Sequence, residues 1–425
     1  MSSRFQNTLV TLSGILVALL LVGVVLGQNR QAPSTDPYRH LNVFTEVLAK
    51  IKSDYVEEPD MKSVSLGAVN GLLVSIDPFA CYLNADQYKQ YVKTLENPRA
   101  GVGLILSRKY GYEIGVVASI PGSPADKAGL TTGDIIEAIN GIQTRDMPLA
   151  FADVLLHGEP GTTVELTVLR LTRPEPVAVK LTRAVVTPPP LEAKMLDAET
   201  GYIATIDLRA GKSAAIAEAI QGLAAKGAKR LVLDLRGAAL SVPEEGPALA
   251  DLFLDKGAIA TVKGQTVKPQ SYEATAAKTV FRGPLVVLIN RGTTGAAEVA
   301  AAALAAHKRA EIVGERSYGD AAVRKPVATG DGGAVLLAVA KYYTPDGKAI
   351  NETSVVPAHL VADAAPQSFD EEEPGMPAPQ DLKQPERKED SVLKKALEVL
   401  RAGQAQALAA PGAGSSSGKH FDKGA

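Results

Sequence analysis

Short apolar runs rich in β-branched residues alternate with alanine-rich segments of helical length between residues 187 and 362. YIATIDL and RLVLDL flank SAAIAEAIQGLAAKGAK, and PLVVLIN and AEIVGE flank AAEVAAAALAAHK. Strands that are apolar along both faces are buried on both sides, and helices connect them as βαβ units. The pattern therefore predicts an α/β core around a largely parallel sheet.

An uncharged apolar run at residues 8–27 is a second strong signal. Its length suits a helix that crosses a hydrocarbon core of about 30 Å. Arg4 before the run favours a cytoplasmic N-terminus, although Arg30 after it weakens the charge asymmetry. We expect a single-pass anchor in the cytoplasmic membrane, with the bulk of the chain exported to the periplasm or the cell exterior. A cleaved signal peptide is the alternative.

The 425 residues are too many for one ordinary core. The pattern predicts a multidomain protein of the α+β and α/β classes with five regions. These are an anchor and linker at 1–40, a helical N-terminal region at 41–98, a small β-domain at 99–186, the α/β core at 187–362, and a linker, short helix and disordered tail at 363–425. The first predicted helix has one apolar stripe, made by Val43, Val47, Ile51 and Tyr55.

The β-domain begins with GVGL at 101–104, and a later strand ends in SIPGSPADKAGLTTGD. We expect Pro124 to start a short helix, Asn140 and Gly141 to form a tight turn, and a second helix to span 149–157. The segment resembles a PDZ domain. The resemblance implies binding of polypeptide C-termini or a partner protein, with the terminal carboxylate held at Gly101, Val102, Gly103 and Leu104.

Several ordered blocks outside the β-domain resemble the carboxy-terminal processing peptidases, also called tail-specific proteases. The blocks are LGAVNGLLVSIDPFACYL in the N-terminal region and VLDLR, LADLFLDKG, PLVVLIN, AEIVGERSYG and KYYTPDGKAI in the core. Members of that family use a serine nucleophile, a lysine base, an assisting glutamine and a glycine pair that helps to form an oxyanion hole. The resemblance therefore implies a fold shared with these serine-type peptidases.

The positions that the resemblance assigns to catalysis hold other residues here. The nucleophile position is Gly295, and the base position, 25 residues later as in the family, is Asp320. Arg324 stands at the glutamine position, and Leu240-Ser241 replaces the glycine pair. Glycine offers no nucleophile, and neither aspartate nor a permanently protonated arginine replaces a lysine base. We therefore expect no catalytic residues and interpret the chain as a pseudoprotease, in which Asp320 and Arg324 pair with each other.

Two other functions remain open. One is an active serine-type endopeptidase with a displaced nucleophile, in which Thr293, Thr294 or Ser317 acts near Lys325. We expect instead that the two threonines cap a helix and that Lys325 is a solvated surface charge. The other is a structural subunit of an envelope complex whose peptide groove is vestigial.

Composition and residue spacing argue against several classes of ligand. A net charge of −2 gives no electrostatic case for nucleic acid binding. The five histidines are scattered without metal-ligand spacing, and the glycines of GVGL precede a strand rather than a helix, so we expect no metal and no dinucleotide cofactor. The single cysteine, Cys81, lies in the apolar stretch FACYL and is expected to be a buried thiol.

Overall fold

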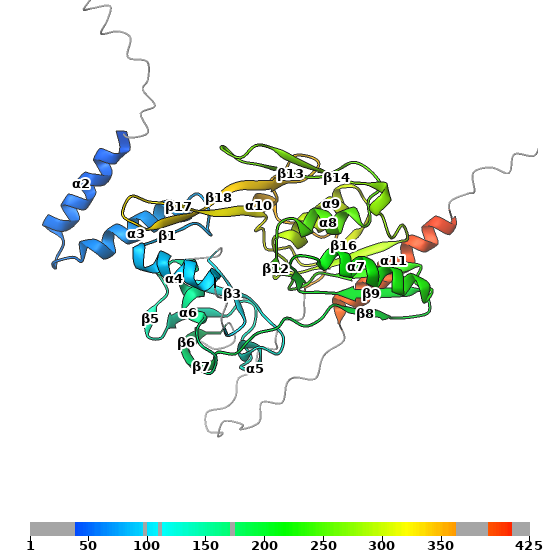
Figure 1. The fold of residues 1–425 in the computed structure, drawn as a ribbon, viewed down its shortest axis with the longest axis horizontal. Coiled ribbons are helices and arrows are strands. Elements are labelled where there is room, and N and C mark those ends of the chain that lie inside the picture. Colours follow the sequence, from blue (N-terminus) through cyan, green and yellow to red (C-terminus); the bar gives the residue numbers. More distant parts are fainter. Residues whose placement is uncertain (1–38, 97–99, 109–112, 171–174, 363–389, 410–425) are drawn as a thin grey trace, which may run out of the picture. The chain divides into compact units, whose positions relative to one another are not determined.

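The computed structural model describes residues 39–96, 100–108, 113–170, 175–362 and 390–409 (Figure 1). The chain divides into two compact units, one that ends at Ala68 and one that begins at Val69. No helix within the described ranges is long and apolar enough to cross a membrane. The predicted anchor at 8–27 lies outside them and stays a prediction, as does the linker at 363–388.

The N-terminal region is helical, as the sequence predicts, and it also contains a strand. Its elements are α2 (Arg39–Asp54), α3 (Met61–Val74), β1 (Cys81–Leu83) and α4 (Ala85–Glu96). The predicted apolar stripe is largely exposed within the first unit, with Val43 59% and Val47 51% accessible. The strand β1 is not predicted from the sequence, and the Cys81 thiol in it is buried as expected.

The β-domain is an antiparallel sheet in the order β2-β3-β4-β6-β7, with β5 beside β4. The strands are β2 (Leu104–Ser107), β3 (Ile114–Ser119), β4 (Ile135–Ile139), β5 (Ile142–Gln143), β6 (Thr163–Leu169) and β7 (Val177–Thr182). The predicted helices are present as α5 (Pro124–Lys127) and α6 (Leu149–Leu156). Asn140 and Gly141 both have positive φ, which confirms the tight turn between β4 and β5. The first strand, β2, lies at an edge of this sheet.

The core sheet has the order β19-β16-β15-β11-β9-β8, and all neighbours are parallel except β8 and β9. Its strands are β8 (Glu192–Met195), β9 (Thr200–Ala204), β11 (Arg230–Asp234), β15 (Leu285–Ile289), β16 (Glu311–Gly314) and β19 (His359–Leu360). This confirms the predicted largely parallel sheet.

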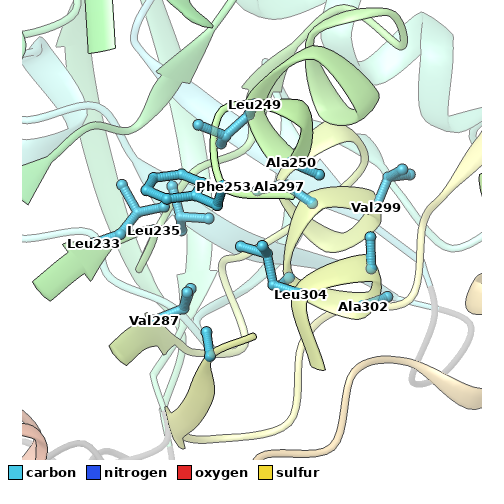
Figure 2. Packing of buried hydrophobic residues seen from close by; sticks show 14 of the residues in the cluster. Leu233, Leu235, Leu249, Ala250, Phe253, Val287, Ala297, Val299, Ala302 and Leu304 are labelled. Atoms are coloured by element: carbon cyan, nitrogen blue, oxygen red, sulfur yellow. The ribbon is translucent and has the colours of Figure 1, made fainter. Parts of the chain in front are cut away.

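Helices cover both faces of this sheet, because alternate strand residues point to opposite sides. The helices α7 (Lys212–Ala225), α8 (Glu245–Asp251) and α9 (Ala296–Ala306) pack on one face. Figure 2 shows Leu249 of α8 and Leu304 of α9 gathered with Leu233 and Val287 of the sheet. The helix α11 (Ser391–Ala409) packs on the other face, against residues such as Val286 and Val313.

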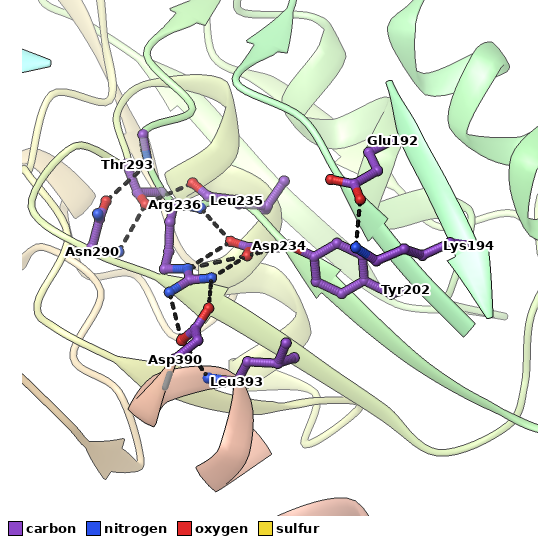
Figure 3. Close-up of polar contacts among 11 residues, drawn as sticks. Glu192, Lys194, Tyr202, Asp234, Leu235, Arg236, Asn290, Thr293, Asp390 and Leu393 are labelled. Atoms are coloured by element: carbon purple, nitrogen blue, oxygen red, sulfur yellow. Dashed lines mark hydrogen bonds and ion pairs between the residues drawn. The ribbon is translucent and has the colours of Figure 1, made fainter. Parts of the chain in front are cut away.

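An ion-pair network fastens the start of α11 to the sheet (Figure 3). The Asp234 carboxylate accepts hydrogen bonds from the Tyr202 hydroxyl at 2.8 Å and from the Arg236 guanidinium at 2.6 Å. The same guanidinium donates to Asp390 at 2.7 Å and 3.1 Å. Asp390 in turn accepts the backbone N–H of Leu393 at 2.9 Å in the first turn of α11.

A second sheet lies beside the core and has the order β1-β18-β13-β14, with β17 also paired to β18. Its remaining strands are β13 (Ala258–Lys263), β14 (Gln270–Glu273), β17 (Ala322–Ala328) and β18 (Ala334–Tyr343). The small elements are β10 (Asp207–Leu208) paired with β12 (Leu240–Ser241), a 3₁₀ turn at Ala276–Lys278 and α10 (Ile350–Thr353).

Candidate functional site

Gly295, at the predicted nucleophile position, occupies a sharp turn between β15 and α9. Its backbone has φ 56° and ψ −118°, a conformation that strains any residue with a side chain. A Cβ atom placed on this glycine would lie 2.8 Å from the Ser241 Oγ. Gly295 therefore offers no nucleophile, and a side chain at this position would contact the Ser241 hydroxyl.

Ser241 stands at a position where the family has a glycine. Its hydroxyl accepts a hydrogen bond from the backbone N–H that would otherwise face a developing oxyanion. In serine hydrolases with a strand-turn-helix nucleophile, the backbone N–H after the nucleophile commonly supplies that donor. The corresponding group here is the N–H of Ala296, and it donates to the Ser241 Oγ at 3.4 Å. The oxygen of this protein's own side chain thus lies where a substrate oxygen would need to sit.

Asp320 and Arg324, at the base and glutamine positions, form the predicted pair. An Asp320 carboxylate oxygen lies 2.5 Å from a guanidinium nitrogen of Arg324. The guanidinium also lies 3.6 Å from the Asp77 carboxylate and 4.3 Å above the centre of the Phe79 ring. Arg324, on β17, therefore holds the segment before β1 by charge and by a cation–π contact. The position that the resemblance assigns to the base is thus part of an ion-pair cluster.

The fully buried Glu298 connects the Gly295 turn to the Asp320 loop. One carboxylate oxygen accepts the N–H groups of Gly295 at 3.1 Å and Asp320 at 2.7 Å. The other accepts the Ser317 hydroxyl and the Gly319 N–H, each at 2.5 Å. Burial raises the pKa of Glu298 to about 7, and these four donors act in the opposite direction because they favour the anion. No pattern in the sequence predicts this role for Glu298.

The hydroxyls considered for a displaced nucleophile have structural partners. Thr293 is fully buried, donates to the carbonyl oxygen of Leu235 at 2.8 Å and accepts the Asn290 N–H at 3.0 Å (Figure 3). The prediction that it caps α9 is therefore wrong: Thr293 joins the ends of β11 and β15. Ser317 is committed to Glu298 and to the Val355 N–H.

Thr294 and Lys325 complete that set. Thr294 is also nearly buried, but no side-chain hydrogen bond from it to α9 occurs among the described residues, so its predicted capping role is wrong too. Lys325 is exposed, as expected. In the part of the chain that the structure describes, none of the candidate hydroxyls makes a hydrogen bond to a lysine or a histidine. The same part contains no cluster of His, Cys, Asp or Glu side chains that could hold a metal ion.

The GVGL loop has the geometry expected of a site that binds a chain terminus. Gly103 has φ 79°, and a Cβ atom on it would lie 2.3 Å from the Ser123 Cβ, so only glycine fits. The N–H groups of Val102 and Gly103 find no acceptor among the described residues. A cavity of about 610 Å³ opens beside the loop, and Leu104 and Leu156 contribute to its lining. His157, the last residue of the helix predicted at 149–157, lies in the same lining, although the sequence pattern assigns it no role of its own.

The raised pKa of Glu298 predicts a specific dependence of stability on pH. A carboxyl whose pKa rises from 4.5 unfolded to about 7 folded stabilises the fold fully below pH 4.5, and that contribution is lost as the pH rises through 7. The loss amounts to at most about 3.5 kcal/mol, at about 1.4 kcal/mol per pKa unit. Glu298→Gln cannot titrate, so we expect it to lower the free energy of unfolding by more at pH 5 than at pH 8.

Denaturant unfolding of both proteins at several pH values measures this difference, with Glu273→Gln on the exposed strand β14 as the control. A larger effect of Glu298→Gln at pH 8 than at pH 5 would show the opposite sign. It would mean that the four donors outweigh burial and hold Glu298 as an anion.

Comparison with known proteins places this geometry in a family. Residues 199–361 match the profile of Peptidase family S41, and residues 115–170 match that of a PDZ domain. The carboxy-terminal processing protease CtpA of Bacillus subtilis is 32% identical over 335 residues, which cover 78% of this chain and 71% of that protein. A carboxyl-terminal-processing protease of Picosynechococcus is 32% identical over 73% of this chain and 76% of its own length.

The fold agrees with this relationship. A solved structure of a photosystem II D1 C-terminal processing protease superposes with a TM-score of 0.62 at 27% identity, and covers 76% of this chain and 93% of its own. The two profile matches, the identity with carboxy-terminal processing proteases and the shared fold lead to one assignment: this chain belongs to the carboxy-terminal processing peptidases of family S41.

Proposed function

We propose that this protein is a non-catalytic member of its family, a pseudoprotease that binds polypeptide C-termini or a partner protein through its PDZ domain. One observation carries the proposal. Gly295 stands at the nucleophile position without a side chain, and the Ser241 Oγ lies 2.8 Å from the place that the Cβ of a nucleophile would occupy. The relatives compared above are named as proteases, and the proposal distinguishes this chain from them by the residues at its own site.

The remaining substitutions support the same conclusion. A serine attacks only when a neighbouring base accepts its proton, and a lysine acts as that base only when its pKa is depressed. The residue at the base position, Asp320, is instead held by Arg324 at 2.5 Å. Arginine stays protonated at physiological pH and accepts no proton from a nucleophile. The nucleophile, the base and the assisting glutamine of the family's reaction are therefore all absent from their positions.

A displaced nucleophile is the less favoured alternative. Ser317 and Thr293 are already bound to Glu298 and Leu235, respectively, and both are buried. Ser241 accepts the Ala296 N–H, a group that would otherwise stabilise an oxyanion. If Ser241 were the nucleophile, its own oxygen would occupy the Ala296 N–H, which would then not be free to stabilise the oxyanion.

The PDZ groove supports the binding part of the proposal. The edge strand β2 can pair with an added peptide strand, and the N–H groups of Val102 and Gly103 can receive a terminal carboxylate. The apolar lining contributed by Leu104 and Leu156 suits an apolar terminal side chain. A purely structural subunit with a vestigial groove is the competing function.

The apolar run at 8–27 supports a tether to the cytoplasmic membrane, with the folded domains exported. We predict that the mature protein retains this run and stays with the membrane after carbonate extraction. N-terminal sequencing of the purified protein tests this directly. A mature N-terminus near Gln28 in a soluble fraction would show a cleaved signal peptide instead.

The proposal predicts no peptidase activity. The full-length protein in detergent should not cleave an unfolded protein such as casein or a fluorogenic peptide with an apolar C-terminal tail. Gly295→Ser alone should also be inactive, because the new Cβ meets Ser241 and the base, glutamine and oxyanion groups are still missing.

The combined variant Leu240→Gly, Ser241→Gly, Gly295→Ser, Asp320→Lys, Arg324→Gln is the matched positive control. It restores every changed group on the retained scaffold, and we expect measurable turnover from it alone. Turnover by the unaltered protein that disappears in Ser241→Ala or Thr294→Ala would overturn the pseudoprotease proposal and favour a displaced nucleophile.

Peptide capture by the PDZ domain has its own test. The full-length protein should bind apolar C-terminal peptides with dissociation constants in the micromolar range, about −8 kcal/mol. Amidation of the peptide terminus should weaken binding at least tenfold, because a charge-assisted hydrogen bond is worth about 1.5–3 kcal/mol. Titration calorimetry measures both. Equal affinity for acid and amide forms, or no binding, would favour the structural subunit.

A further inference from the structure

His157 follows the last turn of α6 and lies against the first glycine of the GVGL loop. A Cβ atom built on Gly101 would be 3.1 Å from the Cδ2 and 3.2 Å from the Nε2 of the imidazole. The Cδ2–Nε2 edge of the ring therefore faces the backbone at which the loop begins. The side chain is one-third exposed, at 33%, and it lines the same cavity as Val102 and Gly103. A titratable group thus stands beside the proposed carboxylate site.

The other ring nitrogen determines which tautomer the neutral imidazole adopts. His157 Nδ1 lies 2.8 Å from the carbonyl oxygen of Asp153. A carbonyl oxygen can only accept a hydrogen bond, so Nδ1 must be the nitrogen that bears hydrogen. The neutral ring then presents the unprotonated Nε2, with its lone pair, toward the GVGL loop. The protonated ring presents an N–H donor and a positive charge at the same place.

We infer that His157 makes the capture of a polypeptide C-terminus by this PDZ domain proton-dependent, by donating from Nε2 to the terminal carboxylate only when the ring is protonated. The inference rests on the proposed peptide binding. A carboxylate in the loop would meet two backbone donors and a lone pair at high pH, and a further charged donor at low pH. Affinity should therefore increase as the pH falls from 8 to 5, where imidazoles change charge.

The charges around His157 decide how strong this effect is. On α6 itself, the Asp153 carboxylate lies 3.9 Å from Nδ1. Arg183, the residue that directly follows β7, donates to the carbonyl oxygens of Leu155 at 2.8 Å and Leu156 at 3.3 Å, which fixes the end of α6. The other titratable or charged side chains that line the cavity are Tyr91, Arg209, Asp320, Arg324 and Lys325.

Asp153, on the helix that His157 follows, is a neighbour that could mimic the effect. Burial raises the pKa of the Asp153 carboxyl above its usual value, and the nearby His157 only partly opposes this rise. Protonation of Asp153 on acidification would also reduce repulsion of a peptide carboxylate. The two residues can be separated by substitution, because Asp153→Asn leaves the imidazole and its carbonyl contact in place.

The test uses the full-length protein in detergent and an N-acetylated decapeptide that ends in Val-Ala-Leu and has no titratable side chain. Its amidated twin is the matched ligand control. Titration calorimetry at pH 5.5, 6.5, 7.5 and 8.5 should show the acid peptide binding about tenfold more tightly at the lowest pH than at the highest. The amide should show no such trend. At pH 6.5, titrations in two buffers of different ionisation enthalpy should reveal proton uptake on binding.

Two variants assign the titrating group. His157→Gln keeps a polar side chain of similar length without a charge change in this range, and we expect its affinity to be independent of pH. Asp153→Asn should retain the dependence. Thermal unfolding of each variant checks that the domain is folded, and the buffer experiment on the unaltered protein needs no variant.

The outcomes separate this inference from the proposed function. No binding of the acid peptide at any pH would overturn peptide capture itself. Binding that prefers the acid form but does not vary with pH would leave peptide capture intact and overturn the role of His157. Loss of the dependence in Asp153→Asn but not in His157→Gln would assign the titration to the aspartate and also overturn it.

Discussion

The buried carboxylate of Glu298 is the interaction on which the geometry of the site depends. It joins the turn at Gly295 to the loop at Ser317–Asp320, two segments that follow different strands. Four donors converge on it: three are backbone N–H groups and the fourth is the Ser317 hydroxyl, so none is a side chain at the nucleophile or base position. Because this support is independent of the reacting groups, the site can keep its shape after those groups have changed. A buried charge without such partners would cost several kcal/mol.

The parallel sheet explains why these loops meet. The segments that hold Ser241, Gly295 and Asp320 follow the carboxyl ends of β11, β15 and β16, which are neighbours in the sheet. In open α/β sheets this edge is where sites form, because the chain leaves adjacent strands at one place. Thr293 reinforces the edge by bridging Leu235 and Asn290. The scaffold therefore brings the three segments together whatever side chains they carry.

Local patterns in the sequence predicted most of the fold. Apolar runs predicted the buried strands, and the presence of Asp320 and Arg324 at the base and glutamine positions led to the prediction that these two residues pair. The strand β1 was missed because it is three residues long and pairs with β18, more than 250 residues away. Thr293 was misassigned because capping is a local preference, whereas its partner Leu235 lies 58 residues earlier. The positions of Ser241 and His157 beside distant glycines follow from tertiary structure, and no local pattern encodes them.

The turn at Gly295 has a consequence for any attempt to place a nucleophile there. A side chain at 295 would meet the Ser241 oxygen 2.8 Å away, on a backbone with positive φ. Replacement of Ser241 by glycine removes that contact and loses the hydrogen bond from the Ala296 N–H. The order of the two changes therefore matters: Ser241→Gly made first avoids the contact, whereas Gly295→Ser made first creates it.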